Sequence, residues 1–509
     1  MHQQPILSTV LWLCALCAAA TSTRADERPN IVFLMADDQC SYSLGCYGNT
    51  DVKTPNIDQL AAEGMRFDRH YVTTAICMAS RANVMTGMYE HKTGCNFNHG
   101  PMLDRIWESS YPMLLRDAGY TTAFAGKFGF EVTPAPGEKK RLPKGDFDAW
   151  GGAPGQTHYE TKRNASMAKY AKEFPHSTLS YAAFSQDFIH ESSKKDVPFC
   201  LSISFKAPHR PVTPDPKFDD VYAGMTFLKP KNFGREHGKH LSAQSRQGRQ
   251  YDRFYSWHYA DDYDNVMAKY NQQCYAIDVA VGRIREALKS AGVHDNTVII
   301  YTSDNGFLCG SHGYGSKVIP YEESTRVPLV MFDPRVASNE QNRYSESLTG
   351  SIDFAPTILD LAGIEVPSTM DGRSLVPIYE SANTDIHESL MLTNAWGPAP
   401  NQSLSIVTDE WKYIYWYFGD KDDASGFTPT EELFDVKHDP LELHNRTNDA
   451  TATHALEKLR THYDKAVEDW RTNGVRHHRY QHYATLFDRH MKWADKSALI
   501  KSIDQPKGD

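Results

Sequence analysis

Four runs of apolar residues, each as long as a β-strand and each followed by polar residues, constrain the fold of this chain most strongly. They cover residues 30–35, 120–125, 199–205 and 297–302. An unbroken apolar run of this length is typical of a strand that is buried on both faces. Helical patterns accompany these runs at residues 54–62, 266–291 and 352–362. Strands that alternate with helices predict an α/β fold, in which a mostly parallel sheet is flanked by helices.

The pattern changes after about residue 380. Short aromatic or β-branched runs with polar spacers follow at residues 403–407, 412–417 and 432–434, and a helical pattern covers 453–471. These runs predict a smaller C-terminal antiparallel sheet with one helix. We therefore expect a main α/β domain at residues 26–385, an α+β subdomain at 386–475 and a polar tail at 476–509.

The N-terminus has the pattern of a secretory signal. An apolar run at residues 6–20 is followed by small residues, which predicts a signal peptide over residues 1–25, although the first four residues hold no Lys or Arg. This run is short for a membrane span, and no later segment is long and apolar enough. We expect an exported protein, periplasmic or secreted, without stable membrane insertion. The net charge of -10 gives no support for binding nucleic acid.

Nine cysteines occur, and Cys14 and Cys17 would leave with the signal. Seven remain in the mature chain, where Cys40 and Cys46 could pair in an oxidising compartment. No C-x-x-C motif remains, so a zinc ribbon is not expected.

The polar residues that end the apolar runs are candidates for a shared site. They are Asp37 and Asp38, Lys127, His209, and Asp304 with Asn305. Ligands in open α/β sheets bind beyond the carboxyl ends of the strands, so these side chains should meet there. Three carboxylates and an amide form an oxygen-donor set that suits Ca²⁺ or Mg²⁺. A single Asp-Asp pair would more often be a solvated turn, but two polar pairs that each close a buried strand favour a metal.

Cys77 and Arg81 lie four residues apart in a segment, residues 77–87, that starts a predicted helix. A helix start presents free N–H groups and the positive end of the helix dipole, which favour an anion. Arg81 would lie on the same face, one turn later. This is a suitable setting for an activated nucleophile. On its own, a C-x-x-x-R pattern is more often a buried cysteine at a helix start.

Taken in order along the chain, these motifs resemble the landmarks of the type I sulfatases, which belong to the alkaline-phosphatase superfamily. The landmarks are Ala36-Asp37-Asp38, Thr54-Pro55-Asn56, residues 77–87, Gly126-Lys127, Lys206-Ala207-Pro208-His209, Ser303-Asp304-Asn305-Gly306, Lys317, Arg326-Val327-Pro328 and Asp371-Gly372. The resemblance extends from about residue 28 to residue 445. It implies the fold of that superfamily and the hydrolysis of a sulfate ester.

The resemblance also implies roles for individual residues. The Ca²⁺ ligands would be Asp37, Asp38, Asp304, Asn305 and the modified Cys77. In the family this Cys is oxidised to formylglycine, whose hydrate attacks sulfur and whose second hydroxyl later expels sulfate. Arg81 would stabilise the oxyanion of that hydrate, and Lys127 and Lys317 would neutralise sulfate oxygens. His209 would protonate the leaving oxygen, with His312 as the alternative acid. Outside this context, such Lys and His residues are more often surface or loop residues.

The sequence departs from the family pattern at two positions. Ala79 replaces a common Pro, which resembles the form matured by an anaerobic radical type of formylglycine-generating enzyme. Gly129 stands where the family commonly has a His that contacts the formylglycine, in Gly126-Lys127-Phe128-Gly129. The missing His must be replaced by another residue or by water, or turnover is slow.

The expected substrate is a sulfated carbohydrate. Residues 147–159 resemble a segment of glycan sulfatases, and residues 229–259 combine basic and aromatic side chains. The basic ones are Lys229, Lys231, Arg235, Lys239, Arg246, Arg249 and Arg253, and the aromatic ones include Phe254, Tyr255, Trp257 and Tyr259. Cations beside aromatic planes suit a polyanionic sugar, although a solvated loop explains the stretch equally well. Two other functions stay open: a phosphodiesterase or phosphonate hydrolase of the same superfamily, and an exported glycan-binding protein without turnover.

Overall fold

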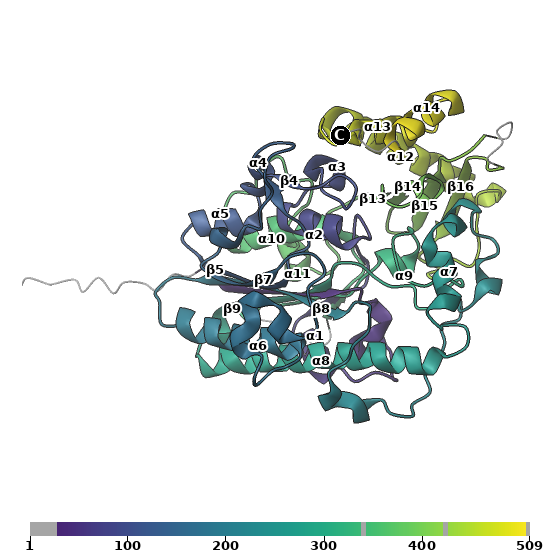
Figure 1. The fold of residues 1–509 in the computed structure, drawn as a ribbon. Coiled ribbons are helices and arrows are strands. Elements are labelled where there is room, and N and C mark those ends of the chain that lie inside the picture. The colour runs from purple at the N-terminus through teal and green to yellow at the C-terminus, as the bar shows by residue number, and fades with distance from the viewer. Residues whose placement is uncertain (1–27, 337–342, 421–425, 505–509) are drawn as a thin grey trace, which may run out of the picture.

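The main domain is built on one eight-stranded sheet, seen in a computed structural model that describes residues 28–336, 343–420 and 426–504 (Figure 1). The strand order is β11-β2-β10-β9-β1-β8-β5-β7. The bounds are Arg343–Ser345, Met65–Phe67, Leu329–Phe332, Thr297–Ser303, Asn30–Asp37, Phe199–Pro208, Thr121–Lys127 and Ala149–Ala153, in that order. The five strands from β9 to β7 are parallel, and β10 is antiparallel to both of its neighbours. The mostly parallel sheet predicted from the sequence is confirmed.

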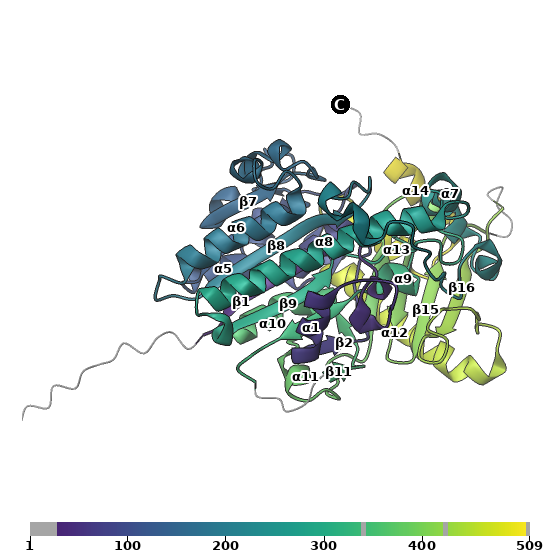
Figure 2. The same cartoon turned by 90° about the horizontal axis from the view of Figure 1, so that it is seen from below.

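Helices cover both faces of this sheet, as the two views show (Figures 1 and 2). One face carries α1 (Pro55–Glu63), α6 (Ser177–Ser192) and α8 (Tyr263–Ser290), and the other carries α2 (Cys77–Thr86), α5 (Tyr111–Asp117) and α10 (Phe354–Leu361). Successive residues of β1 therefore enter two separate cores. Val32 belongs to the core beneath α6 and α8, and Phe33 belongs to the core with Phe354. This two-sided burial explains why the strand sequence is apolar without alternation.

The C-terminal sheet is antiparallel, with the order β13-β14-β15-β16. Its strands are Leu390–Asn394, Ser403–Val407, Trp411–Trp416 and Thr430–Asp435. One face of β15 packs Tyr413 and Tyr415 against helix α12 (Thr453–Asn473), whereas the other face packs Ile414 and Trp416 against Tyr321 of the main domain. The predicted small antiparallel sheet with one helix is present, and it is joined to the main domain by a shared core.

The residues after 475 differ from the polar tail that the sequence suggested. They form helices α13 (Tyr480–Leu486) and α14 (Trp493–Asp504). Tyr480 and Tyr483 are completely buried against Trp470 of α12. The aromatic residues of this segment therefore complete the C-terminal core.

The predicted signal peptide lies outside the described residues. Among the helices described, none is both long and apolar enough to cross a bilayer. The seven cysteines in the described part of the chain are free thiols, so Cys40 and Cys46 are not paired. The Cys40 thiol lies 3.4 Å from the hydroxyl of Tyr270.

Candidate active site

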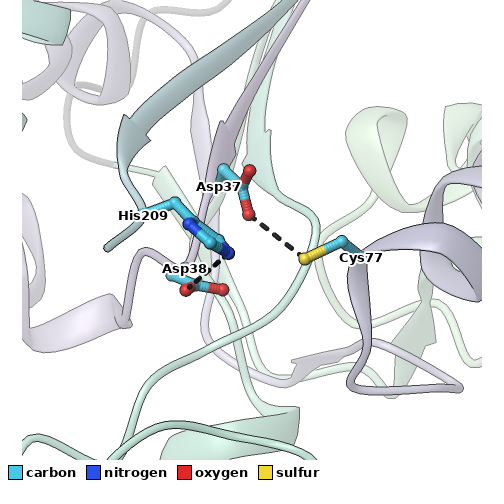
Figure 3. Close-up of side chains that lie close together, drawn as sticks. All are labelled: Asp37, Asp38, Cys77 and His209. Atoms are coloured by element: carbon cyan, nitrogen blue, oxygen red, sulfur yellow. Dashed lines mark hydrogen bonds and ion pairs between the residues drawn. The ribbon is translucent and has the colours of Figure 1, made fainter. Parts of the chain in front are cut away.

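The predicted strand-end residues meet at one edge of the central sheet. Asp37 is the last residue of β1 and Lys127 is the last residue of β5, while His209 and Asp304 directly follow β8 and β9. These four strands are parallel neighbours, so their carboxyl ends point the same way. Figure 3 shows Asp37 and Asp38 facing His209 and Cys77 across this edge.

Cys77 is the first residue of α2 and is buried. Its Sγ lies 3.4 Å from Oδ1 of Asp37 and 2.7 Å from Nζ of Lys317 (Figure 3 shows the first contact). Burial, with a further contribution from the Asp37 carboxylate, raises the pKa of the Cys77 thiol to about 12. An unmodified Cys77 is therefore a protonated thiol at neutral pH and a weak nucleophile.

Arg81 lies one turn further along α2 and is completely buried. Its Nε lies 2.9 Å and its Nη2 lies 2.8 Å from Oδ2 of Asp304, and its Nη1 donates to the backbone carbonyl of Lys127. Burial and the nearby Asp37 raise the pKa of Asp304 to about 6, although Arg81 opposes this shift. The guanidinium thus ties helix α2 to the ends of β5 and β9.

Two lysines balance the remaining carboxylates. Nζ of Lys127 lies 2.6 Å from Oδ2 of Asp37, and Lys317 forms an ion pair with Asp38. Burial raises the pKa of the Asp37 carboxyl, but Lys127, with the other nearby cations, outweighs burial and holds it well below its usual value. Together with the Arg81–Asp304 pair, the site contains three cations and three carboxylates, so its buried charges are matched.

The donor set fits a hard cation such as Ca²⁺. Donor atoms of Asp37, Asp38, Cys77 and His209 lie within 4.8 Å of one another. Nδ2 of Asn305 donates to Asp38 at 2.6 Å, whereas Oδ1 of Asn305 is buried and has no hydrogen-bond partner among the described residues. A buried oxygen without a partner is costly. A cation would satisfy it, and oxygen donors are those that Ca²⁺ and Mg²⁺ prefer.

A cavity of about 630 Å³ opens above this cluster. Its floor includes Asp38, Cys77, His209 and Lys317. Its walls are formed by Ile76, Phe97, Gln156, Arg210, Pro211, Arg249, Arg253, Trp257, Ser316, Val318 and Trp396. The cavity has the size of a pocket for a small ligand such as a sugar.

The basic and aromatic stretch at residues 229–259 contributes only in part to this cavity. Arg249, Arg253 and Trp257 line it. The guanidinium of Arg246 instead donates to the backbone carbonyls of Lys239 and Leu241, at 2.9 and 2.7 Å. Arg246 therefore has a structural role.

Gly129 cannot carry the family His without a rearrangement. Its φ is +95°, and a Cβ built there would lie 2.5 Å from Cδ of Arg81. Phe128 is buried among the rings of Phe124, Phe130 and Trp107. The aromatic core therefore fixes the chain so that only glycine fits beside Arg81.

The structure does not bring His312 to this cluster. Its ring is completely buried, with Nδ1 3.0 Å from the carbonyl of His237 and Nε2 3.1 Å from Nδ2 of Asn232. His312 also does not line the cavity. These contacts suit a structural histidine and place its ring away from the position of an acid for the leaving oxygen.

Five wall residues were not singled out from the sequence: Ile76, Phe97, Ser316, Val318 and Trp396. Trp396 follows β13 of the C-terminal sheet, and Ser316 precedes Lys317. Neither Ser316 nor Trp396 lies at the end of a strand of the main sheet or in a recognisable motif. Only the packing of the two domains brings Trp396 to the cavity.

Two family models match the chain, and they overlap. The family model described as "Sulfatase" matches residues 29–364, and the one described as "N-sulphoglucosamine sulphohydrolase, C-terminal" matches residues 310–469. The chain is 29% identical over 503 residues to an N-acetylglucosamine-6-O-sulfatase of Bacteroides thetaiotaomicron, covering 86% of each chain. It is 31% identical over 413 residues to the N-acetylglucosamine-6-sulfatase of Homo sapiens, covering 78% of this chain and 72% of the relative.

A solved structure has a similar fold, with a TM-score of 0.70 and 27% sequence identity. The match covers 88% of this chain and 99% of that one. That protein was solved in complex with its substrate, D-glucosamine-2-N,6-O-disulfate.

Proposed function

Since this chain belongs to the type I sulfatase family of the alkaline-phosphatase superfamily and is a sulfuric ester hydrolase, we propose a specific substrate for it. The proposed reaction is the removal of sulfate from an amino sugar of a sulfated glycan. The observation that carries the proposal is the position of Cys77 at a helix start, in contact with both Asp37 and Lys317. Position 77 is the nucleophile, and the Sγ atom stands where the oxygens of a formylglycine would lie.

The thiol itself is poorly suited to the reaction, because its raised pKa keeps it protonated. A formylglycine at position 77 would supply a hydrated aldehyde, a nucleophilic oxygen that is stronger towards sulfur than a buried thiol. We propose that a maturation enzyme makes this change, and Ala79 favours one of the anaerobic radical type. Cys77 and Ala79 are both buried, which favours a change made before α2 is packed.

The metal ligands that we propose are Asp37, Asp38, Asp304, Asn305 and the modified residue 77. A bound Ca²⁺ would supply positive charge beside the nucleophile and would lower the cost of an oxyanion there. The partnerless Oδ1 of Asn305 supports this assignment.

The two lysines are proposed to hold the sulfate group. Lys127 and Lys317 now lie against Asp37 and Asp38. If a cation shares those carboxylates, N–H donors of both ammonium groups become free to bind the oxygens of a sulfate ester. Charged donors fixed in a buried site stabilise charge that is redistributed as the S–O bond breaks. Arg81 fixes the start of α2 beside Asp304.

His209 is the proposed acid for the leaving oxygen. Its ring lines the cavity, and its Nε2 lies 3.8 Å from Oδ2 of Asp38. A dashed line marks this contact in Figure 3. Its Nδ1 faces the carbonyl of Arg210, which holds the ring orientation. Of the two histidines predicted as acids, His209 lines the cavity and His312 does not.

The proposed substrate follows from the relatives and from the cavity. Both relatives quoted above are named as sulfatases of N-acetylglucosamine carrying a 6-sulfate. The cavity can hold a sugar ring above Cys77 and is bordered by Trp257 and Trp396. Flat indole faces are suited to the apolar face of a sugar. An exported location, predicted from residues 1–25, would place the enzyme where sulfated glycans occur.

The test is the release of inorganic sulfate by the matured, Ca²⁺-loaded enzyme. We expect hydrolysis of glucosamine 6-sulfate and much slower hydrolysis of phosphate and phosphonate monoesters. Faster hydrolysis of the phosphorus esters would overturn the proposal in favour of a phosphonate hydrolase or phosphodiesterase. Saccharide binding without turnover of any ester by the matured protein would show a glycan-binding protein instead.

A further inference from the structure

The wall of the active-site cavity carries three arginines that have no carboxylate partner. They are Arg210, Arg249 and Arg253. Within the residues that the structure describes, none of the three lies in an ion pair, although Arg66, Arg81, Arg335 and Arg489 all do. Asp38 is the single acidic residue in the lining of this cavity. The wall is therefore strongly cationic.

The spacing on α7 (Arg249–Ser256) explains how two of these arginines reach the cavity together. Arg249, Arg253 and Trp257 are four residues apart, so they lie along one face of the helix and its end. The guanidinium carbon of Arg249 lies 4.6 Å from the ring centre of Trp396. That of Arg253 lies 4.1 Å from the ring centre of Trp257.

Arg210 approaches the same indole from another part of the chain. Its guanidinium carbon lies 4.3 Å from the ring centre of Trp257. Arg210 directly follows His209, at the end of β8. Stacking on an indole holds a guanidinium in place while leaving its N–H donors free. The two tryptophans thus orient the three arginines without neutralising them.

The crowding of these cations has an energetic cost. Burial, and then the nearby Arg249, lowers the pKa of Arg253 to about 10. Nη1 of Arg253 donates to Oγ of Ser316 at 2.7 Å, and this neutral hydroxyl does not offset the charge. The Asp38 carboxylate opposes this shift without cancelling it. Like charges that converge repel one another, and an anion bound between them would relieve that repulsion.

A single sulfate ester does not account for this set of cations. It carries one negative charge, and Lys127, Lys317 and Arg81 already surround Cys77. Arg253 lies next to that group, because its partner Ser316 directly precedes Lys317. A second anionic group on the same sugar or its neighbour would therefore reach the arginines while the scissile sulfate lies at Cys77.

We propose that Arg210, Arg249 and Arg253 form a second anion subsite, which selects saccharides that carry a further sulfate or carboxylate beside the scissile sulfate. The fork of a guanidinium donates two parallel hydrogen bonds to either group. The proposal rests on the proposed function for the position of the scissile ester. Its ligand chemistry is a doubly anionic saccharide, with an N- or O-sulfate or a uronic acid as the source of the second charge.

The test measures binding without turnover, so that it does not depend on catalysis. In the Cys77→Ala protein, dissociation constants are measured by calorimetry for three ligands. They are glucosamine 6-sulfate, glucosamine 2-N,6-O-disulfate, and a disaccharide of a uronic acid with glucosamine 6-sulfate. We expect at least one doubly anionic ligand to bind 10- to 100-fold more tightly than the monosulfate, the range for charge-assisted hydrogen bonds. The ligand with the higher affinity identifies the second anionic group.

Further substitutions in the Cys77→Ala protein show which arginines cause the preference for doubly anionic ligands. Arg249→Gln and Arg253→Gln should each reduce the preference for the doubly anionic ligand by 10-fold or more. Arg283→Gln is the matched control, because Arg283 stacks on Phe174 outside the cavity, and it should leave the preference unchanged.

Equal affinity for all three ligands would overturn the subsite, as would arginine variants that weaken every ligand by the same factor. A preference for doubly anionic ligands in binding, with no sulfate release by the matured enzyme, would uphold the subsite and overturn the proposed hydrolysis. The two proposals can therefore fail separately.

Discussion

Nζ of Lys317 lies 2.7 Å from Sγ of Cys77 and also forms an ion pair with Asp38. One side chain thus connects the proposed nucleophile with the proposed metal ligands. Lys317 lies in the loop between β9 and α9 (Glu322–Thr325), far in sequence from both partners. We expect it to stabilise charge on the sulfate group and to hold position 77 towards the sheet edge.

Lys317→Gln should lower kcat/KM for sulfate release by about 10²–10³-fold, because a fixed charged donor at the reacting group is lost. KM should change less than kcat if the contact strengthens as the S–O bond breaks. Lys289→Gln, an exposed position on α8 paired with Glu286, is the control and should have no effect. A change of less than about 3-fold for Lys317→Gln would rule out this role.

Ca²⁺ should raise the midpoint of thermal unfolding, because a ligand that binds only the folded state stabilises it. Asp304→Asn removes one proposed ligand charge and should abolish most of this shift. Asp333→Asn, whose carboxylate is paired with Arg335 outside the cavity, should keep the shift. An equal Ca²⁺ response of both variants in scanning calorimetry would argue against metal binding by Asp304.

Gly129→Ala should destabilise the fold and disturb the active site together. A left-handed φ and a Cβ only 2.5 Å from Cδ of Arg81 together should cost about 1–3 kcal/mol of unfolding free energy. Gly137→Ala is the matched control, since its φ is +87° and no atom lies within 4 Å of the added Cβ. Denaturant unfolding should show a larger loss for Gly129→Ala than for Gly137→Ala. Equal losses would mean that Arg81 moves aside freely.

Asp278 of α8 lies away from the active site. We expect it to make the free energy of unfolding depend on pH. Burial raises its pKa to about 7, although it accepts hydrogen bonds from Nδ2 of Asn56 and N of Ile57, both at 2.8 Å. The folded state therefore holds this proton more tightly than the unfolded state. Its contribution is complete below the unfolded pKa, near 4, and is lost as pH rises through about 7.

Asp278→Asn should remove this pH dependence, which amounts to about 4 kcal/mol at most. The difference in unfolding free energy between wild type and variant should thus change across pH 4 to 7. The check is denaturant unfolding at several pH values. A difference that stays constant over this range would show that Asp278 has an ordinary pKa in the folded protein.

Local sequence was sufficient to predict the sheet and the polar residues that meet at its edge. Strands such as β1 are buried on both faces, so their apolar runs are unbroken, and Asp37 and Asp304 are visible as the polar residues that end them. His312 was misjudged because closeness in sequence to Lys317 does not determine where its ring points. Trp396 could not be assigned from sequence, since it reaches the cavity only through the packing of the C-terminal sheet.

The helices after residue 475 also could not be predicted from local sequence. Tyr480 and Tyr483 are separated by polar residues, so no period of a packed helix was apparent. They are buried because Trp470, on a helix that precedes them, offers a partner surface. Long-range packing of this kind overrides the local pattern.

The central claim is that position 77 acts as a formylglycine, and peptide mass spectrometry across residues 77–87 tests it most directly. Preparations with different degrees of maturation should be compared for the fraction of Cys77 converted to the aldehyde and for the rate of sulfate release. We predict that the rate is proportional to the converted fraction and is absent from Cys77→Ala. Full sulfatase activity in protein whose Cys77 is entirely an unmodified thiol would contradict the account.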